Sequence, residues 1–270
     1  MNAQMASHQQ QKDLVREQFT RTAQVFGDYA VASRVAEAER LARMVKAGPA
    51  DLAVDLACGP GTLALRFARH VRWICGFDLT PAILERARRT AAAEGLANLE
   101  FAIGDAQSLP FPDTSLDIAV TSYSVHHFPD PARNIGEMAR VVRRGGRVGI
   151  LDIFLPDDLA ISAVNTRIEK LRDASHTRTL SCEEFERHFA AHGLRVLETG
   201  VEENSRSFDH WMLVAGLKPG DPNYAEARRL MEASIPSDAA WFHPRFEPGD
   251  FGQPELLLTN TTFFIAGEKL

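Results

Sequence analysis

The segment Ala53–Ala64, with the sequence AVDLACGPGTLA, constrains the fold of this chain more than any other. An apolar run ends in the carboxylate Asp55, a Gly-Pro-Gly turn follows, and a helical pattern begins. A second apolar run, WICGFD, ends 23 residues after Asp55 in Asp78. Glycine lets the backbone turn sharply and approach a ligand closely, because it has no side chain. This strand–loop–helix unit predicts a doubly wound α/β sheet that binds an adenosine-containing cofactor.

Asp55 distinguishes two possible cofactors. The run Gly59–Ala64 fits the G-x-G-x-x-G/A pattern of dinucleotide sites, which is a weak signal on its own. A dinucleotide would place its pyrophosphate over this turn, where the carboxylate of Asp55 would repel it. S-adenosylmethionine carries an ammonium and a sulfonium group instead, so Asp55 would attract it, directly or through water. The sequence therefore favours S-adenosylmethionine, with a nucleotide-dependent oxidoreductase as the alternative.

A third acid supports the same choice. It follows the strand-like run Leu99–Ile103, in the sequence Gly104-Asp105-Ala106. At the end of a third parallel strand, Asp105 can accept a hydrogen bond from the exocyclic amine of adenine, and the backbone N–H of Ala106 can donate to the ring. Each of the three acids could instead cap the next helix. Together they offer, in chain order, partners for an ammonium group, a ribose and an adenine.

The chain resembles the class I S-adenosylmethionine-dependent methyltransferases, in the ubiquinone/menaquinone C-methyltransferase-like (type 11) branch. The resemblance extends from about Phe19 to about Val201 through VDLACGPGT, GFDL, GDAQSLPFPDTSLDIAV, HHFPDPARNIGEMARVVRRGGRV and RDASHTR. Relatives more often have glycine where this chain has Ala57. The loop 121–128 differs from that of the quinone enzymes, which argues against a quinone acceptor. The resemblance implies an enzyme that transfers a methyl group from S-adenosylmethionine and releases S-adenosyl-L-homocysteine.

The resemblance also implies that an amino-terminal helical segment containing Phe19, Phe26 and Tyr29 folds over the cofactor as a lid. The alternative is that this segment only packs against the sheet. Closure of a lid would exclude water from the reaction. The residues expected to contact the cofactor are Phe19, Tyr29, Asp55, Ala57, Gly59, Gly61, Asp78, Leu79, Gly104, Asp105, Ala106 and Ser122.

Composition agrees with a cytoplasmic enzyme that acts on a small molecule. The chain has 270 residues, of which 45% are hydrophobic, enough for one large α/β core. No apolar run approaches the roughly 20 residues that cross a bilayer. The first twelve residues lack a secretory signal and are expected to form a flexible tail. The net charge of −6 argues against a nucleic-acid substrate.

The three cysteines, Cys58, Cys75 and Cys182, lack metal-ligand spacing and fit a reducing compartment. Cys58 lies in the cofactor loop, where oxidation is one possibility and a buried, inert thiol is the preferred interpretation. The histidines likewise lack a set of partner ligands, so we expect no metal.

The alternation of apolar runs and helical patterns predicts a Rossmann-like sheet of seven mostly parallel strands, with helices on both faces. Strands are expected near 52–57, 73–78, 99–103, 117–122, 146–153, 194–201 and 259–267. One or two amphipathic helices are expected within 13–46, and further helices near 62–70, 81–94, 132–143, 157–173 and 182–192. The last strand is expected to enter antiparallel, as the resemblance implies. We divide the chain into tail and lid (1–46), methyltransferase core (47–203), insertion (204–257) and returning strand (258–270).

The insertion is unusual, because almost sixty residues separate the last two strands where a hairpin needs only a few. The segments 207–217 and 224–233 have helical periodicity, and 235–254 is rich in proline and aromatic residues. These aromatic residues either anchor the insertion to the sheet edge or to a second subunit of a homodimer, or contact the substrate. They are Trp211, Trp241, Phe242, Phe246 and Phe251.

Methyl transfer requires the acceptor to be aligned with the methyl group and shielded from water. A general base is needed only if the acceptor loses a proton, as a hydroxyl group does. His126 and His127 follow the fourth strand and are the candidate catalytic residues, although a single histidine is more often structural. Because adjacent side chains point apart, we expect at most one of them to face the site.

Tyr123, His176 and Arg178 are the expected substrate contacts. For the loop 172–178, the alternative is local capping of the next helix at Ser181, completed by Glu184. The acceptor and the methylated atom stay open, with oxygen or carbon of an aromatic or otherwise activated compound favoured. A non-catalytic S-adenosylmethionine-binding module is the alternative from another functional class, and an intact acceptor cavity would favour the enzyme.

Overall fold

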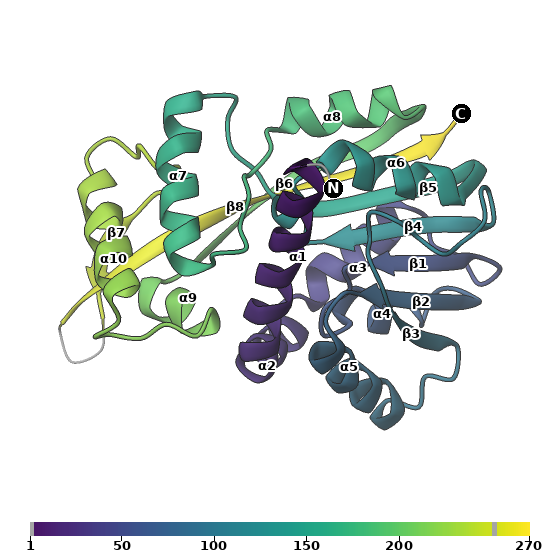
Figure 1. The fold of residues 1–270 in the computed structure, drawn as a ribbon, viewed down its shortest axis with the longest axis horizontal. Coiled ribbons are helices and arrows are strands. Elements are labelled where there is room, and N and C mark those ends of the chain that lie inside the picture. Colours follow the sequence, from purple (N-terminus) through teal and green to yellow (C-terminus); the bar gives the residue numbers. More distant parts are fainter. Residues whose placement is uncertain (1–2, 250–252) are drawn as a thin grey trace.

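The computed structural model describes residues 3–249 and 253–270, which form one continuous sheet flanked by helices (Figure 1). The strand order is β3-β2-β1-β4-β5-β8-β6, and the short β7 pairs with β8. The doubly wound α/β fold predicted from the sequence is confirmed. The seven predicted strands are β1–β6 and β8, while β7 is an additional strand within the insertion. Their bounds are β1 Leu52–Leu56, β2 Trp73–Asp78, β3 Leu99–Ile103, β4 Leu116–Ser122, β5 Val142–Ile153, β6 Leu194–Ser207, β7 Arg245–Pro248 and β8 Pro254–Lys269.

The first five strands run parallel, and β8 pairs antiparallel with both β5 and β6. The expected antiparallel last strand is therefore confirmed. Strands β1 and β4 carry apolar residues on both sides, so both faces of the sheet are buried under helices. One face is covered by α3 (Val35–Met44), α4 (Thr62–Phe67) and α5 (Pro81–Ala93), and the other by α6 (Pro131–Val141) and α8 (Cys182–Ala191).

The amino-terminal segment forms α1 (Ala3–Arg21) and α2 (Ala23–Ser33) before α3. Figure 1 shows α1 lying across the end of the sheet toward which β1 and β4 point. The flexible tail predicted for residues 1–12 is therefore wrong for residues 3–12, which are helical, and residues 1–2 lie outside the described part. The segment is rich in alanine and glutamine, which favour helix, and tertiary contacts described below hold it in place.

The insertion is built on an extension of β6 and β8 beyond the main sheet. Their pairing continues from Glu202↔Thr262 to Ser207↔Leu257, so the predicted division points after residues 203 and 257 fall inside continuous strands. Helices α7 (Leu159–Arg172), α9 (Phe208–Val214) and α10 (Pro222–Ser234) gather around this extension (Figure 1). They share a hydrophobic core of their own, lined by Ile168, Phe208, Trp211, Met212, Tyr224, Ala227, Met231, Ala240, Phe242, Leu256 and Leu258.

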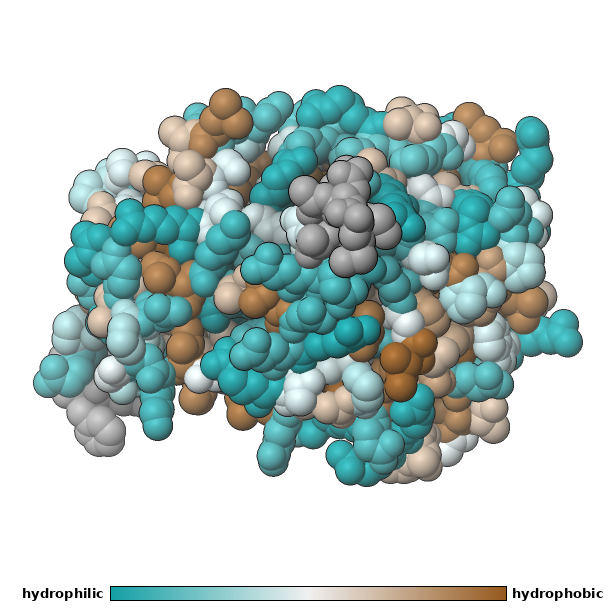
Figure 2. Space-filling view, viewed as in Figure 1, coloured by the Kyte–Doolittle hydropathy of each residue, from teal (hydrophilic) through white to brown (hydrophobic). Residues whose placement is uncertain are grey.

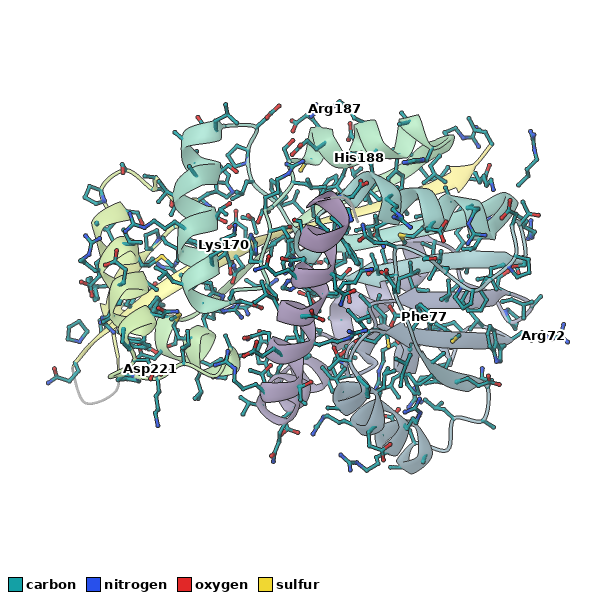
Figure 3. All side chains as sticks on the ribbon, viewed as in Figure 1. Arg72, Phe77, Lys170, Arg187, His188 and Asp221 are labelled. Atoms are coloured by element: carbon teal, nitrogen blue, oxygen red, sulfur yellow. The ribbon has the colours of Figure 1, made fainter. Side chains whose placement is uncertain are left out.

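The aromatic residues of the insertion differ in how far they are buried. Trp211 and Phe242 are each 2% exposed within the separate core, as the anchoring interpretation requires. Trp241 is half-buried and Phe246 is 47% exposed. Phe251 lies outside the described residues. In Figure 3, Asp221 before α10 and Arg72 before β2 mark opposite ends of the molecule, so the insertion lies far from the amino-terminal end of β2.

The surface seen in Figure 2 is mainly hydrophilic, with hydrophobic residues dispersed among polar ones. Across residues 3–249 and 253–270, the helices are too short or too polar to span a bilayer.

Candidate functional site

A cavity of about 870 Å³, its mouth included, opens at the carboxyl ends of the strands beneath α1. We call it the cofactor cavity. Carboxyl-terminal strand ends are where doubly wound sheets bind ligands. Nine of the twelve residues expected to contact the cofactor line it, namely Phe19, Ala57, Gly59, Asp78, Leu79, Gly104, Asp105, Ala106 and Ser122. The other three, Tyr29, Asp55 and Gly61, do not.

Asp55 lies behind the loop and not at the cavity. Its side chain is 1% exposed, and Oδ2 accepts a hydrogen bond from the backbone N of Ala64 at 3.0 Å. This contact satisfies a free N–H group in the first turn of α4. Burial raises the pKa of the Asp55 carboxyl well above its usual value. The other oxygen, Oδ1, is buried and has no hydrogen-bond partner among the described residues, so the interaction with an ammonium group, directly or through water, stays a prediction.

Tyr29 and Gly61 also do not line the cofactor cavity, and each contacts other parts of the protein. The Tyr29 ring faces the guanidinium of Arg206, 5.6 Å from its centroid, and does not line the cavity. Gly61 immediately precedes α4, as its N-cap, with a φ of +84°, a conformation that favours glycine. A Cβ there would lie 3.2 Å from the Phe101 ring. Its role is to let the loop turn and pack.

The loop after β1 is held by Asp78 at the end of β2. Asp78 Oδ2 accepts a hydrogen bond from Gly59 N at 2.9 Å, and Oδ1 accepts one from Thr80 N at 2.8 Å. A carboxylate oxygen can accept more than one hydrogen bond, so Asp78 retains capacity toward ribose hydroxyl groups. Ala57 takes a φ of +48°, in the left-handed region, which explains why glycine suits this position in relatives.

Gly104 also lines the cofactor cavity. A Cβ at this position would lie 2.1 Å from Phe77 Cζ, so only glycine fits without movement of the ring. The next residue, Asp105, accepts a hydrogen bond from Gln107 N at 2.9 Å through Oδ1. Its Oδ2 lies 2.6 Å from Lys12 Nζ. An adenine amine at Asp105 would therefore share this carboxylate with a lysine from α1.

Helix α1 contributes residues that the sequence analysis missed. Gln11, Lys12 and Val15 line the cofactor cavity together with Phe19. Gln11 Nε2 donates to the backbone oxygens of His127, at 3.1 Å, and Ser175. These contacts join segments more than one hundred residues apart, so no local pattern could have indicated them.

A second cavity, of about 630 Å³ with its mouth, adjoins the first, and we call it the acceptor cavity. Residues shared by both cavities are Phe19, Phe26, Arg34, Tyr123 and His127. The remaining lining is Gln18, Thr22, His126, Ile153, Glu169, Arg172, Asp173, Arg206, Trp211, Val214, Ala215 and Asn260. Trp211 thus both anchors the insertion and faces this cavity.

Of the three expected substrate contacts, only Tyr123 lines a cavity. Its Oη donates to Glu37 Oε1 at 2.8 Å, and the guanidinium of Arg34 lies 3.8 Å from its ring centroid. His176 is buried, with its ring stacked on that of His126 at 5.2 Å, and lines neither cavity. His176 is therefore not placed to contact a substrate. Its ring packs against His126, which itself lines the acceptor cavity.

Arg178 is exposed on the surface and pairs with Glu184 at 2.9 Å. The alternative interpretation of this loop is confirmed: Ser181 and Glu184 form a capping box at the start of α8. Arg178 extends this capping arrangement and does not reach either cavity.

Both candidate catalytic histidines reach the acceptor cavity. They lie in the short 3-10 turn η1 (Val125–His127), with ring centroids 4.2 Å apart. The expectation that at most one would face the site is wrong, because residues in such a turn are rotated by about 120° and not 180°. His127 lines both cavities, while His126 lines the acceptor cavity alone.

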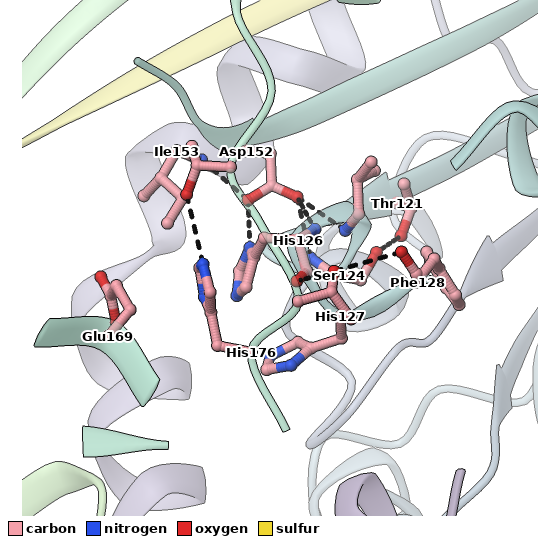
Figure 4. Close-up of polar contacts among 12 residues, drawn as sticks. Thr121, Ser124, His126, His127, Phe128, Asp152, Ile153, Glu169 and His176 are labelled. Atoms are coloured by element: carbon pink, nitrogen blue, oxygen red, sulfur yellow. Dashed lines mark hydrogen bonds and ion pairs between the residues drawn. The ribbon is translucent and has the colours of Figure 1, made fainter. Parts of the chain in front are cut away.

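Asp152, at the end of β5, organises this turn (Figure 4). Its carboxylate is 1% exposed and accepts hydrogen bonds from the backbone N of Val125 at 2.7 Å and of Ser124 at 3.2 Å. The Nδ1 of His126 lies 2.6 Å from its Oδ1. Asp152 was not among the residues predicted from the sequence, although an acid near the end of a fifth strand was a visible signal.

Burial governs the charge of this pair. It raises the pKa of Asp152 to about 7 and lowers the pKa of His126 well below its usual value. His126 is therefore neutral, and the backbone donors around Asp152 favour its carboxylate form above about pH 7. A neutral imidazole that donates from Nδ1 to a carboxylate keeps its Nε2 free to accept a proton.

His127 is held by different partners. Its Nδ1 lies 3.1 Å from the backbone oxygen of Ser175 and from Ser175 Oγ. Ser175 Oγ donates to Asp173 Oδ1 at 2.6 Å, and the Phe19 ring meets the imidazole edge to face at 5.3 Å. Since a carbonyl oxygen only accepts, the proton of His127 belongs on Nδ1, and Nε2 is again the acceptor.

The described residues include no group of three or more His, Cys, Asp and Glu side chains arranged to hold a metal ion. The chemistry available at the junction of the two cavities is proton acceptance by imidazole, together with binding by charged and aromatic side chains.

Comparison with known proteins gives consistent matches. The family described as a methyltransferase domain matches residues 53–146. The chain is 32% identical over 219 residues to the uncharacterized methyltransferase YcgJ of Bacillus subtilis, covering 80% of this chain and 85% of YcgJ. The crystal structure of YcgJ superposes with a TM-score of 0.78 at 28% identity, covering 87% and 98% of the two chains. The 27-O-demethylrifamycin SV methyltransferase of Amycolatopsis mediterranei is 31% identical over 159 residues, 58% of each chain.

Proposed function

Because the chain belongs to the class I S-adenosylmethionine-dependent methyltransferases, we propose that it methylates a small-molecule acceptor held in the acceptor cavity. The methylated atom is an oxygen or a carbon of an aromatic or otherwise activated compound. The observation that carries this proposal is the junction of the two cavities at Phe19, Tyr123 and His127. A donor in one cavity and an acceptor in the other would meet at this junction, beneath α1.

S-adenosylmethionine is the cofactor of this family, and when bound it supplies a methyl group on a sulfonium leaving group. The residues of the cofactor cavity fit it. Asp78 offers hydrogen-bond acceptors to ribose hydroxyl groups. Asp105 and Ala106 line the same cavity, which supports their proposed role at the adenine edge, and α1 covers the cavity.

His127 is the proposed general base for a hydroxyl acceptor, because it stands where the cavities meet and its Nδ1 is held by Ser175. His126, oriented by Asp152, is the second candidate. For a carbon acceptor, alignment and exclusion of water by Phe19 and α1 would suffice. The 27-O-demethylrifamycin SV methyltransferase, whose name specifies an oxygen acceptor, supports the hydroxyl case by similarity.

Calorimetry with S-adenosylmethionine and S-adenosyl-L-homocysteine is the first test. Transfer of a labelled methyl group to a panel of phenols, amines and activated carbon acids follows. His127→Gln should lower turnover by about a hundredfold with cofactor affinity nearly unchanged, and the loss should shrink as pH rises because the acceptor then ionises unaided. His188→Gln, on α8 (Figure 3), is the control. Failure to bind either cofactor form, or cofactor binding without transfer to any acceptor, would contradict the proposal.

A further inference from the structure

The acceptor cavity has an excess of positive charge, although the whole chain has a net charge of −6. Arginines contribute three positive charges to its lining, from Arg34, Arg172 and Arg206. Glu169 and Asp173 contribute two carboxylates, which leaves one positive charge in excess. The sulfonium of the cofactor adds another at the junction. An enclosed space of this sign favours an anionic ligand.

Two of the arginines already have partners. Arg172 donates from Nε to the backbone oxygen of Trp211 at 3.1 Å, and its Nη1 lies 3.4 Å from Glu169 Oε2. Its guanidinium also lies 4.6 Å from the Trp211 ring centroid. Arg34 packs over the ring of Tyr123 and faces both cavities, so it is shared with the cofactor side.

Arg206 differs from both. It lines the acceptor cavity and not the cofactor cavity. Among residues 3–249 and 253–270, no side chain forms an ion pair with its guanidinium, whose nearest aromatic neighbour is the Tyr29 ring at 5.6 Å. Partial burial lowers the pKa of Arg206, because a cation loses hydration there. An anion in the cavity would compensate this loss.

The remaining lining indicates the rest of the ligand. Apolar and aromatic side chains face the acceptor cavity from α1, α2, β5 and α9, namely Phe19, Phe26, Ile153, Trp211, Val214 and Ala215. A ligand that fills the space therefore needs an apolar body beside its charged group. The planar guanidinium matches a carboxylate through two parallel hydrogen bonds.

We propose that the acceptor is a carboxylic acid with an apolar body, and that Arg206 binds its carboxylate. This inference rests on the proposed function and assigns Arg206 as a specificity-determining residue. Arg206 pairs with Leu258 in the extension of β6 and β8 that supports the insertion. The insertion thereby supplies both the charged group and, through Trp211, part of the apolar wall.

Matched acids and amides test the proposal, because they have nearly the same shape and differ in charge. The probes are benzoate, phenylacetate, cinnamate, naphthoate and octanoate, each with its primary amide. Binding is measured by calorimetry on the full chain saturated with S-adenosyl-L-homocysteine. At least one acid should bind about tenfold or more tightly than its amide, as expected for a charge-assisted pair. Arg206→Gln should remove this preference and leave affinity for the amides and for S-adenosyl-L-homocysteine unchanged.

Arg195→Gln is the matched control. Arg195 lies on the same strand, is 59% exposed and pairs with Glu268, so its removal should not change the preference. Should Arg206→Gln not fold, Arg206→Lys serves instead, with an expected loss of about threefold or more for the acid alone.

Two results would overturn the proposal: no acid binding ahead of its amide, or equal losses for acid and amide in the Arg206 variant. Absence of S-adenosyl-L-homocysteine binding in the parent would instead refute the proposed function.

Discussion

Asp152→Asn should reverse the tautomer of His126. In the parent, Oδ2 of Asp152 accepts from Val125 N at 2.7 Å and Ser124 N at 3.2 Å, while Oδ1 accepts from Ile153 N at 2.8 Å and faces His126 Nδ1 at 2.6 Å. Asparagine offers one oxygen and one NH₂ group. With its oxygen toward the turn, the NH₂ group faces His126 Nδ1. The imidazole can then accept there only by moving its proton to Nε2, which removes its capacity to act as a base.

Two opposing effects determine the stability of this variant. The NH₂ group leaves the buried N–H of Ile153 without an acceptor, which costs about 1–3 kcal/mol. Burial raises the pKa of Asp152 from 3.8 to about 7 in the parent, so its ionised carboxylate is unfavourable by about 4 kcal/mol above that pH. Asparagine avoids this penalty. The variant is therefore expected to be no less stable than the parent at about pH 8.

The sign of the pH dependence follows from the same shift. Because the folded pKa lies above the unfolded value, the contribution of Asp152 to stability is fully present below about pH 4. It is lost as the pH rises toward about 7. Between about pH 5.5 and about pH 8, the parent should lose about 2 kcal/mol that the variant does not lose.

Long-range nitrogen NMR of the histidine side chains reads the tautomer directly and needs no acceptor. Urea unfolding at the two pH values reads the stability difference. Asp113→Asn, at a carboxylate that is 74% exposed and paired with Arg140, is the control. The same His126 tautomer in parent and variant, or a stability difference that does not change with pH, would refute the reasoning.

Three further predictions concern the cofactor cavity and its surroundings. Asp78→Ala should weaken S-adenosylmethionine binding by roughly 1.5–3 kcal/mol through lost charge-assisted hydrogen bonds. Unchanged affinity in calorimetry would remove its assignment to the ribose. Gly76→Ala places a Cβ 2.6 Å from Phe101 Cδ1 and 3.0 Å from Cys58 Sγ, so overpacking should destabilise the fold by about 1–3 kcal/mol in urea unfolding. Gly48→Ala, whose nearest contact is 3.6 Å away, is the comparison, and equal effects would contradict the packing argument. Burial raises the pKa of Cys58 well above its usual value and that of Cys75 to about 11. Both thiols should therefore react slowly with iodoacetamide at about pH 8, and rapid labelling of native Cys58 in mass spectrometry would show the opposite.

The sequence by itself determined the order and type of the main elements, because these depend on local patterns. Strand β2 has the predicted bounds, 73–78, and the capping box at Ser181 and Glu184 forms as its spacing indicates. The glycine turn after β1 likewise followed from local backbone requirements, with Gly59 and Gly61 both at positive φ. The residues resembling known methyltransferases were enough to indicate the cofactor.

Only the tertiary structure decided which way the side chains at the strand ends face and which distant segments meet. Asp55 and Asp78 both lie near the carboxyl ends of their strands, yet of the two only Asp78 lines the cofactor cavity. Gln11 reaches the backbone of His127 across 116 residues of sequence. Arg206 enters the acceptor cavity because β6 continues through Ser207 in pairing with β8, beyond the point where its apolar pattern ends. Such contacts arise from packing between elements, and a one-dimensional pattern does not contain that packing.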